Sequence, residues 1–326
     1  MVNYQKIVRG ISLSFLFVAV TIVVFCGVQW FSDSMESLLI NRGVISPASL
    51  ETSINQVSAI VNDPAVFDKN IFPIRKWQVE NVVLQAKSGL SVEIGDNNSK
   101  ILFNQNSEVR LPIASLTKLM TAMVVLSHYD LSAKVTMGPM AMAQIGEQGD
   151  LKLGQEFTVK NLLYTTLMES NNRSAYALSE VLGNEEFIGL MNQDAKNLGM
   201  TNTNFQDVTG LDPSSYSTAK DLVIVTQYLF KNYPLFNEII RQKEYNLYLY
   251  DGIFHHKAVN TNILLGENNI FGGKTGFTKV AQGCFMILQE SPQEKSYIIS
   301  ILLGSQDRFL EMKKLIDWLG MAYQWQ

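Results

Sequence analysis

Hydrophobic and polar positions divide this chain of 326 residues into stretches of different character. Residues 11–31 form a run of 21 positions without a charged side chain, which is long enough for a helix to cross a bilayer. Residues 90–94 and 100–104 are short strand-like runs separated by a turn-forming segment, and this pattern predicts a β-hairpin. Residues 285–288 and 297–303 have the same strand-like pattern near the C-terminus.

Helical patterns fill the region between these strands and close the chain. Apolar residues recur at helical spacing after Pro112, and residues 159–168, 174–182 and 219–230 also have helical patterns. Residues 308–319 predict a final amphipathic helix. Strands at both ends with helices between them predict an α+β fold, in which distant segments form one antiparallel sheet and the helical middle is inserted as a lobe.

Charges beside the long apolar run indicate its orientation. Lys6 and Arg9 precede the run, whereas Asp33 and Glu36 follow it. The positive-inside rule therefore leaves residues 1–10 in the cytoplasm and places the rest of the chain outside.

A cleaved signal peptide is the alternative interpretation of this run. It is longer than the usual apolar core of a signal peptide and has no Ala-x-Ala cleavage site. A lipoprotein signal at Cys26 is disfavoured because bulky Phe25 precedes it. We expect a transmembrane signal anchor at residues 11–31, a stalk at 32–75 and a domain at 76–326 outside a bacterial cell membrane.

The composition excludes some partners and some kinds of site. Apolar residues make up 47% and charged residues 17% of the chain, as in a globular protein with an added membrane segment. The net charge of −4 gives no basic footprint, so we expect no nucleic-acid partner. The two cysteines, Cys26 and Cys284, predict no structural disulfide and are too few for a zinc site.

Ser115 and Lys118 are the first candidates for chemistry. They lie three residues apart at the start of the helix predicted after Pro112. This spacing places both side chains on one face, and the lysine leans back toward the serine. Free backbone N–H groups of the first turn favour a negative oxygen at the serine. The pattern alone is common on solvated helices, so further motifs must support it.

Two later motifs provide that support. Ser170-Asn171-Asn172 falls in the break between two predicted helices, where the first and third side chains can face one ligand. Lys274-Thr275-Gly276 enters the C-terminal strand region, and a glycine in a strand lets another backbone approach closely, as a peptide substrate would.

The order Ser-x-x-Lys, Ser-x-Asn, Lys-Thr-Gly resembles the signature of penicillin-binding proteins and serine β-lactamases. Residues around the three motifs are similar to the low-molecular-mass D-alanyl-D-alanine carboxypeptidases, over about residues 80–322. The resembling segments are residues 111–122, 153–155, 162–163, 209–211, 216–221, 260–262 and 273–278. Arg173 stands where this family usually has aspartate, and Gln282 is inserted after the third motif.

The resemblance implies a transpeptidase-like fold with a sheet of about five strands, and acyl transfer through Ser115. It implies that Lys118 is the base, that Ser170 relays a proton and that Asn172 holds the substrate backbone. Lys274, Thr275 and Gly276 would bind the terminal carboxylate region, and the N–H groups of Ser115 and Phe277 would bind the oxyanion. The implied partners are a peptidoglycan stem peptide as substrate and β-lactam antibiotics as covalent inhibitors, with no metal or organic cofactor.

Several other functions remain as alternatives. A D,D-endopeptidase that cuts cross-links fits the same motifs. A class A β-lactamase would need a deacylating glutamate, and residues 202–212 contain none. A metal-dependent peptidase would need more ligands than His128, His255 and His256, and we expect the adjacent pair in a polar loop. A non-catalytic β-lactam sensor is disfavoured because all three motifs are intact.

Overall fold

The computed structural model describes residues 73–96, 98–146 and 148–325, which belong to one compact unit. The anchor predicted at residues 11–31 lies outside the described residues. Within the described ranges, no helix has both the length and the apolar character that a membrane span requires.

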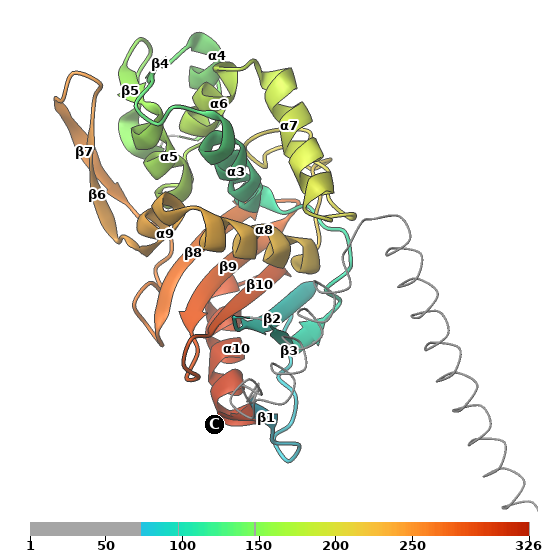
Figure 1. Cartoon of the computed structure of the whole chain (residues 1–326). Coiled ribbons are helices and arrows are strands. Elements are labelled where there is room, and N and C mark those ends of the chain that lie inside the picture. The colour runs from blue at the N-terminus through green and yellow to red at the C-terminus, as the bar shows by residue number, and fades with distance from the viewer. Residues whose placement is uncertain (1–72, 97, 147, 326) are drawn as a thin grey trace, which may run out of the picture. The chain divides into compact units, whose positions relative to one another are not determined.

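Five antiparallel strands form the central sheet, in the order β3-β2-β10-β9-β8 (Figure 1). Their bounds are Ser88–Ile94 for β2, Ser99–Gln105 for β3, Ile270–Thr278 for β8, Gln282–Glu290 for β9 and Tyr297–Ser305 for β10. Strand β2 pairs with β10, where Ser91 lies opposite Ser300 and the two hydroxyl oxygens are 2.8 Å apart. The sheet thus joins segments from both ends of the domain, which confirms the predicted α+β arrangement.

Helices and short strand pairs, joined by loops, surround the central sheet in the described chain. The helices are η1 Ala114–Thr117, α3 Lys118–His128, α4 Pro139–Met142, η2 Gln148–Asp150, α5 Val159–Met168, α6 Asn172–Glu180, α7 Asn184–Asn197, α8 Ala219–Asn232, α9 Pro234–Arg241 and α10 Arg308–Ala322. The short strand pairs are β1 Ile74–Arg75 with β11 Tyr323–Gln324, β4 Lys134–Thr136 with β5 Glu156–Thr158, and β6 Glu244–Tyr248 with β7 Phe254–Val259.

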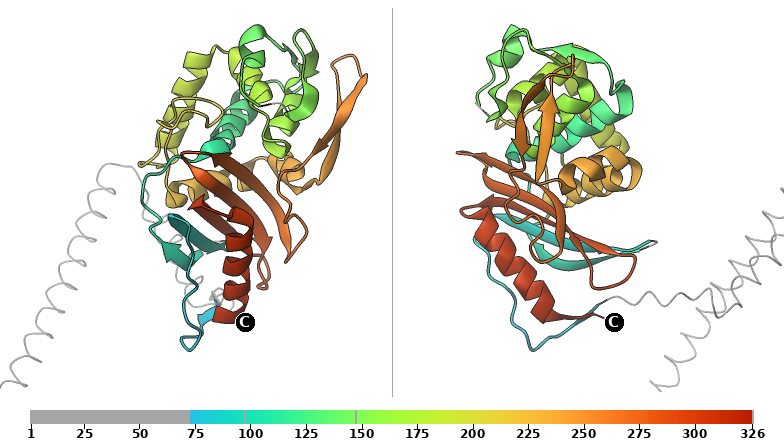
Figure 2. Two further views of the ribbon diagram at one scale, coloured as in Figure 1. Left: turned by 180° about the vertical axis from the view of Figure 1, so that it is seen from behind. Right: turned by 90° about the vertical axis from the view of Figure 1, so that its left-hand side faces the viewer.

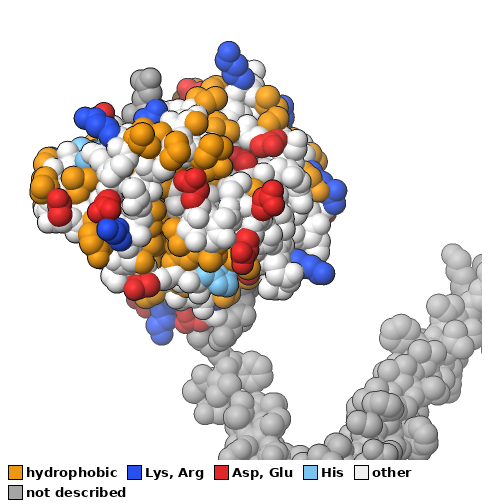
Figure 3. Space-filling view, turned by 90° about the horizontal axis from the view of Figure 1, so that it is seen from above, with side chains coloured by type: hydrophobic (Ala, Val, Ile, Leu, Met, Phe, Trp, Pro, Cys, Tyr) orange, Lys and Arg blue, Asp and Glu red, His pale blue; other side chains and the backbone are white. Residues whose placement is uncertain are grey.

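Two hydrophobic cores hold the sheet between layers of helices (Figure 2). Helix α10 packs Leu315 and Leu319 against Phe285 and Leu302 on one face. The lobe formed by α3 to α7, together with α8, covers the opposite face and contributes the larger core. In the view from above, Lys and Arg side chains are interspersed with Asp and Glu side chains, and neither sign gathers into a patch on that face (Figure 3).

Local sequence signals set several helix boundaries. Helix α5 spans residues 159–168, as predicted, and the Thr158 hydroxyl accepts a hydrogen bond from Asn161 N. Helix α6 begins two residues earlier than predicted because Asn171 caps it, with its side-chain oxygen 3.0 Å from Ser174 N.

The hairpin β6–β7 corrects one prediction. His255 and His256 were expected in a polar loop, but both lie on strand β7. The strand was not predicted because polar side chains occupy successive positions. His256 bonds to the carboxylate of Glu169 instead of packing in an apolar core.

Candidate active site

Ser115 lies in the short helix η1, directly before α3. Strand β8 packs closely against its backbone, because a Cβ atom at Gly276 would lie 2.9 Å from Ser115 N. Gly276 is therefore needed for close contact between the third motif and the helix η1. The close approach that the sequence indicated at this glycine is made by the protein's own backbone.

Lys118, the first residue of α3, is fully buried. Its Nζ lies 3.0 Å from Ser115 Oγ, and it donates to Asn172 Oδ1 at 2.6 Å and to Thr209 O at 2.7 Å. A neutral amine has two N–H groups and one lone pair. Because the two oxygen acceptors take both N–H groups, the lone pair faces the Ser115 hydroxyl.

Burial makes this amine available as a base. Desolvation lowers the pKa of Lys118 from 10.5 to about 7, while the negative charge of Asp207 acts in the opposite direction. A large fraction of Lys118 is therefore neutral near pH 7, as a general base requires.

The carbonyl of Thr209 belongs to a loop that the sequence did not single out as part of the site. Asp207 organises this loop: its Oδ2 accepts from Gly210 N at 2.7 Å and from Leu211 N at 2.9 Å. Thr121 Oγ1, on α3, also donates to Val208 O at 2.7 Å. These bonds fix the oxygen that orients Lys118. An aspartate followed closely by a glycine is the turn signal that could have revealed the loop.

Gly210 allows this loop to lie against η1. Its φ is +85°, and a Cβ atom there would lie 1.9 Å from Ala114 O. We predict that Gly210→Ala lowers the free energy of unfolding by about 1–3 kcal/mol, as overpacking does, and slows acylation more than tenfold by displacing Thr209. Thermal unfolding and penicillin-labelling rates measure the two effects.

Gly199→Ala is the matched control for this substitution. Gly199 has a similar φ of +80°, and no atom lies within 4 Å of a Cβ atom placed there. The Gly199→Ala variant should lose only the stability that an alanine costs at a positive φ, and it should keep the wild-type acylation rate. Equal labelling by the Gly210→Ala variant and wild type would contradict the proposed role of the loop.

Ser170 and Lys274 form the second contact of the site. Lys274 Nζ donates to Ser170 Oγ at 2.7 Å and to Thr275 O at 2.8 Å. Burial lowers the pKa of Lys274 well below its usual value, and the charges of Lys118 and Arg308 add to this effect. Burial is likewise the main cause of the lowered pKa of Lys118.

Asn172, Thr275 and Phe277 complete the set of expected site residues. Asn172 Nδ2 donates to Ile145 O at 2.6 Å, so both ends of this amide are engaged within the protein. Thr275 Oγ1 donates to Thr261 Oγ1 at 2.7 Å. Phe277 lies on β8 with its side chain 57% exposed. The three motifs thus meet at the junction of η1, the α5–α6 break and β8.

Residues 76–307 match the family model described as D-alanyl-D-alanine carboxypeptidase. D-alanyl-D-alanine carboxypeptidase DacF of Bacillus subtilis is 31% identical over 252 residues, which cover 74% of this chain and 63% of that relative. A D-alanyl-D-alanine endopeptidase of Escherichia coli is 32% identical over 243 residues, covering 71% of this chain and 77% of that protein. The chain thus spans less than two thirds of the length of the Bacillus relative.

Solved structures give the same result. The Streptomyces K15 DD-transpeptidase has 28% identity and a TM-score of 0.67, and the match covers 74% of this chain and 100% of that one. Penicillin-binding protein D2 of Listeria monocytogenes, solved in a cefotaxime-bound form, has 29% identity and a TM-score of 0.66, with coverage of 74% and 99%. The fold is therefore transpeptidase-like, and the chain belongs to the D-alanyl-D-alanine carboxypeptidase family.

Proposed function

We propose that this protein is a serine-type D-alanyl-D-alanine carboxypeptidase that removes the terminal D-alanine from peptidoglycan stem peptides. The observation that carries the proposal is the placement of Lys118 Nζ, 3.0 Å from Ser115 Oγ, with its N–H groups directed to two other oxygens. A serine hydroxyl becomes an effective nucleophile when such a base takes its proton.

In the proposed reaction, Ser115 Oγ attacks the carbonyl carbon between the two D-alanines, and Lys118 takes the hydroxyl proton. The oxyanion lies between the N–H groups of Ser115 and Phe277, where the loss of one donor typically costs about 2.7–4 kcal/mol. As the C–N bond breaks, the departing amine receives a proton through Ser170. Water then hydrolyses the serine ester, which releases the shortened peptide and restores Ser115.

Lys274 and Thr275 are proposed to bind the substrate's terminal carboxylate, and Asn172 is proposed to hold its backbone amide. A carboxylate beside Lys274 favours the charged ammonium by its opposite charge. Asn172 Nδ2 donates one of its two N–H groups to Ile145 O at 2.6 Å, which leaves the second N–H group for the substrate.

The free carboxylate leads to a direct test. We predict that diacetyl-Lys-D-Ala-D-Ala releases D-alanine, whereas the same peptide with a C-terminal amide reacts at least tenfold more slowly. Loss of one charge-assisted hydrogen bond costs about 1.5–3 kcal/mol, which supports a difference of this size. D-alanine or D-alaninamide release is measured by mass spectrometry. Equal rates for acid and amide would contradict carboxylate recognition, and no release from either peptide would contradict the proposed function.

A D,D-endopeptidase is the second candidate, because the Escherichia coli relative with that name is 32% identical to this chain, which covers 77% of its length. Digestion of purified peptidoglycan separates the two activities. Loss of terminal D-alanine indicates a carboxypeptidase, whereas conversion of cross-linked dimers to monomers indicates an endopeptidase.

Residues 11–31 are proposed to anchor the protein in a bacterial membrane, with the stalk at 32–75 and the peptidase domain at 76–326 on the extracytoplasmic side. The uncharged run and the basic residues before it support this arrangement. The full chain should remain in the membrane pellet after alkaline carbonate washing. Release into the supernatant would contradict an uncleaved anchor.

A further inference from the structure

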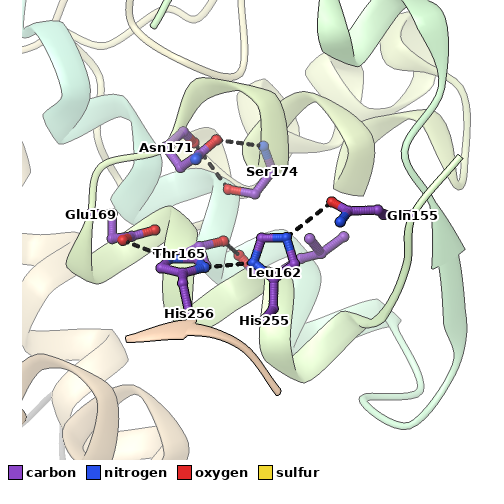
Figure 4. A network of polar contacts seen from close by, with 8 residues as sticks. All are labelled: Gln155, Leu162, Thr165, Glu169, Asn171, Ser174, His255 and His256. Carbon is purple, nitrogen blue, oxygen red and sulfur yellow. Dashed lines mark hydrogen bonds and ion pairs between the residues drawn. The ribbon is translucent and has the colours of Figure 1, made fainter. Parts of the chain in front are cut away.

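A chain of four polar side chains connects the β6–β7 hairpin to the loop that carries Ser170 (Figure 4). His256 Nε2 lies 2.9 Å from Glu169 Oε1, and the Nδ1 atoms of His255 and His256 are 2.6 Å apart. His255 Nε2 lies 3.1 Å from Gln155 Oε1. Glu169 directly precedes Ser170 in sequence, so this chain of contacts ends beside the second motif.

The hydrogen-bond partners determine how many protons the two imidazoles hold. Glu169 presents an acceptor to His256 Nε2. Gln155 Oε1 also presents an acceptor to His255 Nε2, since this oxygen takes the Lys152 N–H at 2.7 Å. Both Nε2 atoms must therefore carry hydrogen, and the Nδ1–Nδ1 contact needs one hydrogen between them. Three protons on four ring nitrogens give the pair one positive charge.

This charge lies on the histidine next to Glu169. Burial lowers the pKa of His255, and the neighbouring His256 adds to this effect. Lys152 acts in the same direction, whereas Asp150 and Glu169 act in the opposite direction. His255 is therefore the neutral member of the pair, and His256 is the charged one that faces the carboxylate.

Glu169 depends on this partner because it is buried. Its side chain is only 9% exposed, and its Oε2 accepts no hydrogen bond from any group in the described part of the chain. A buried carboxylate is costly unless an opposite charge or several donors compensate it. His256 supplies the opposite charge, so loss of its proton would leave Glu169 without compensation.

The same hairpin holds the Ser170 loop at a second point. Thr261 N, beyond the end of β7, donates to Met168 O at 2.9 Å. Ser170 has a φ of +61°, a left-handed conformation that an L-residue adopts only where its surroundings enforce it. The contacts at Met168 and Glu169 flank this strained residue on its N-terminal side, while Lys274 holds its hydroxyl.

We propose that Glu169 and His256 are positioning residues, and that their ion pair holds Ser170 in the orientation needed to relay the proton. This inference rests on the proposed acyl-transfer function. When the histidine pair loses its shared proton, one of its three contacts must break, and the Ser170 loop loses a restraint. The contacts of the pair therefore support catalysis only while the shared proton is present.

Glu169→Gln tests the ion pair with little change in shape. Acylation by a fluorescent penicillin and D-alanine release are followed from pH 5 to pH 10. We expect the maximal acylation rate to fall about tenfold or more, as misplaced groups cause. The rise through about pH 7, as Lys118 becomes neutral, should stay in place.

His256→Gln provides an independent second variant. It should lose a similar factor in acylation rate, and the double variant should be no slower than either single variant, because both changes remove one interaction. Glu244→Gln is the matched control: Glu244, on β6, forms an exposed pair with Lys257 at 3.0 Å, and this variant should keep the wild-type profile.

The outcomes distinguish the two levels of the proposal. An active wild type whose maximal acylation rate equals those of both variants would overturn the positioning role alone. Additive losses in the double variant would also overturn it. A folded wild type that neither labels nor releases D-alanine would overturn the proposed function instead.

Discussion

Ser115→Ala is expected to abolish both D-alanine release and covalent labelling by a fluorescent penicillin. The substitution removes the oxygen that would form the ester while leaving the packing of η1 against β8 intact, because that contact involves the backbone of residue 115. Loss of a serine nucleophile typically lowers kcat by about 10⁶. Labelling is read on a gel and by intact mass.

Ser127→Ala is the matched control, since Ser127 lies on the exposed side of α3, with its hydroxyl 2.6 Å from the Tyr233 hydroxyl. This variant should label like the wild type. Labelling that persists in Ser115→Ala would assign the nucleophile to another residue. A folded wild type that never labels would contradict the proposed active site as a whole.

Lys118→Met is expected to have the second largest effect. Methionine fills a similar buried volume without an amine, so Ser115 loses its base and Asn172 and Thr209 lose a donor. General-base catalysis contributes about 10²–10⁴ in rate, and we expect acylation to slow by a factor in that range. The measurement is the second-order rate constant of penicillin labelling.

The pH dependence tests the same residue in the unmodified protein. Because the pKa of Lys118 is lowered from 10.5 to about 7, the neutral base is present above that pH and is lost as the pH falls through it. Wild-type acylation should therefore fall about tenfold for each pH unit below 7, and Lys118→Met should lack this dependence.

Lys220→Met controls for loss of a lysine as such. Lys220 is exposed and pairs with Glu108 at 2.6 Å, far from the serine in the sequence and without a contact to it. Its variant should keep the wild-type rate and pH profile. A wild-type rate that does not change between pH 5 and pH 8 would contradict the assignment of Lys118 as the base.

Features that depend on local spacing could be predicted from the amino-acid sequence. The period of apolar residues predicted helix α5 with its observed bounds and located β9, β10 and α10. A separation of three residues predicted the contact between Ser115 and Lys118. These predictions succeeded because helix geometry and strand alternation are fixed by backbone dihedrals, which act over a few residues. The order of the three motifs then indicated the family.

The contacts that make the site work join residues far apart in the sequence and arise only in the folded chain. The acceptors of Lys118 come from Asn172 and Thr209, which lie 54 and 91 residues away in sequence, and Lys274 reaches Ser170 across 104 residues. No local spacing encodes such contacts. The lowered pKa of Lys118 follows from burial, which is a property of the assembled core. For the same reason, the pairing of His256 with Glu169 was not visible in the sequence: a hairpin and a helix break must first be brought together before the two charges can meet.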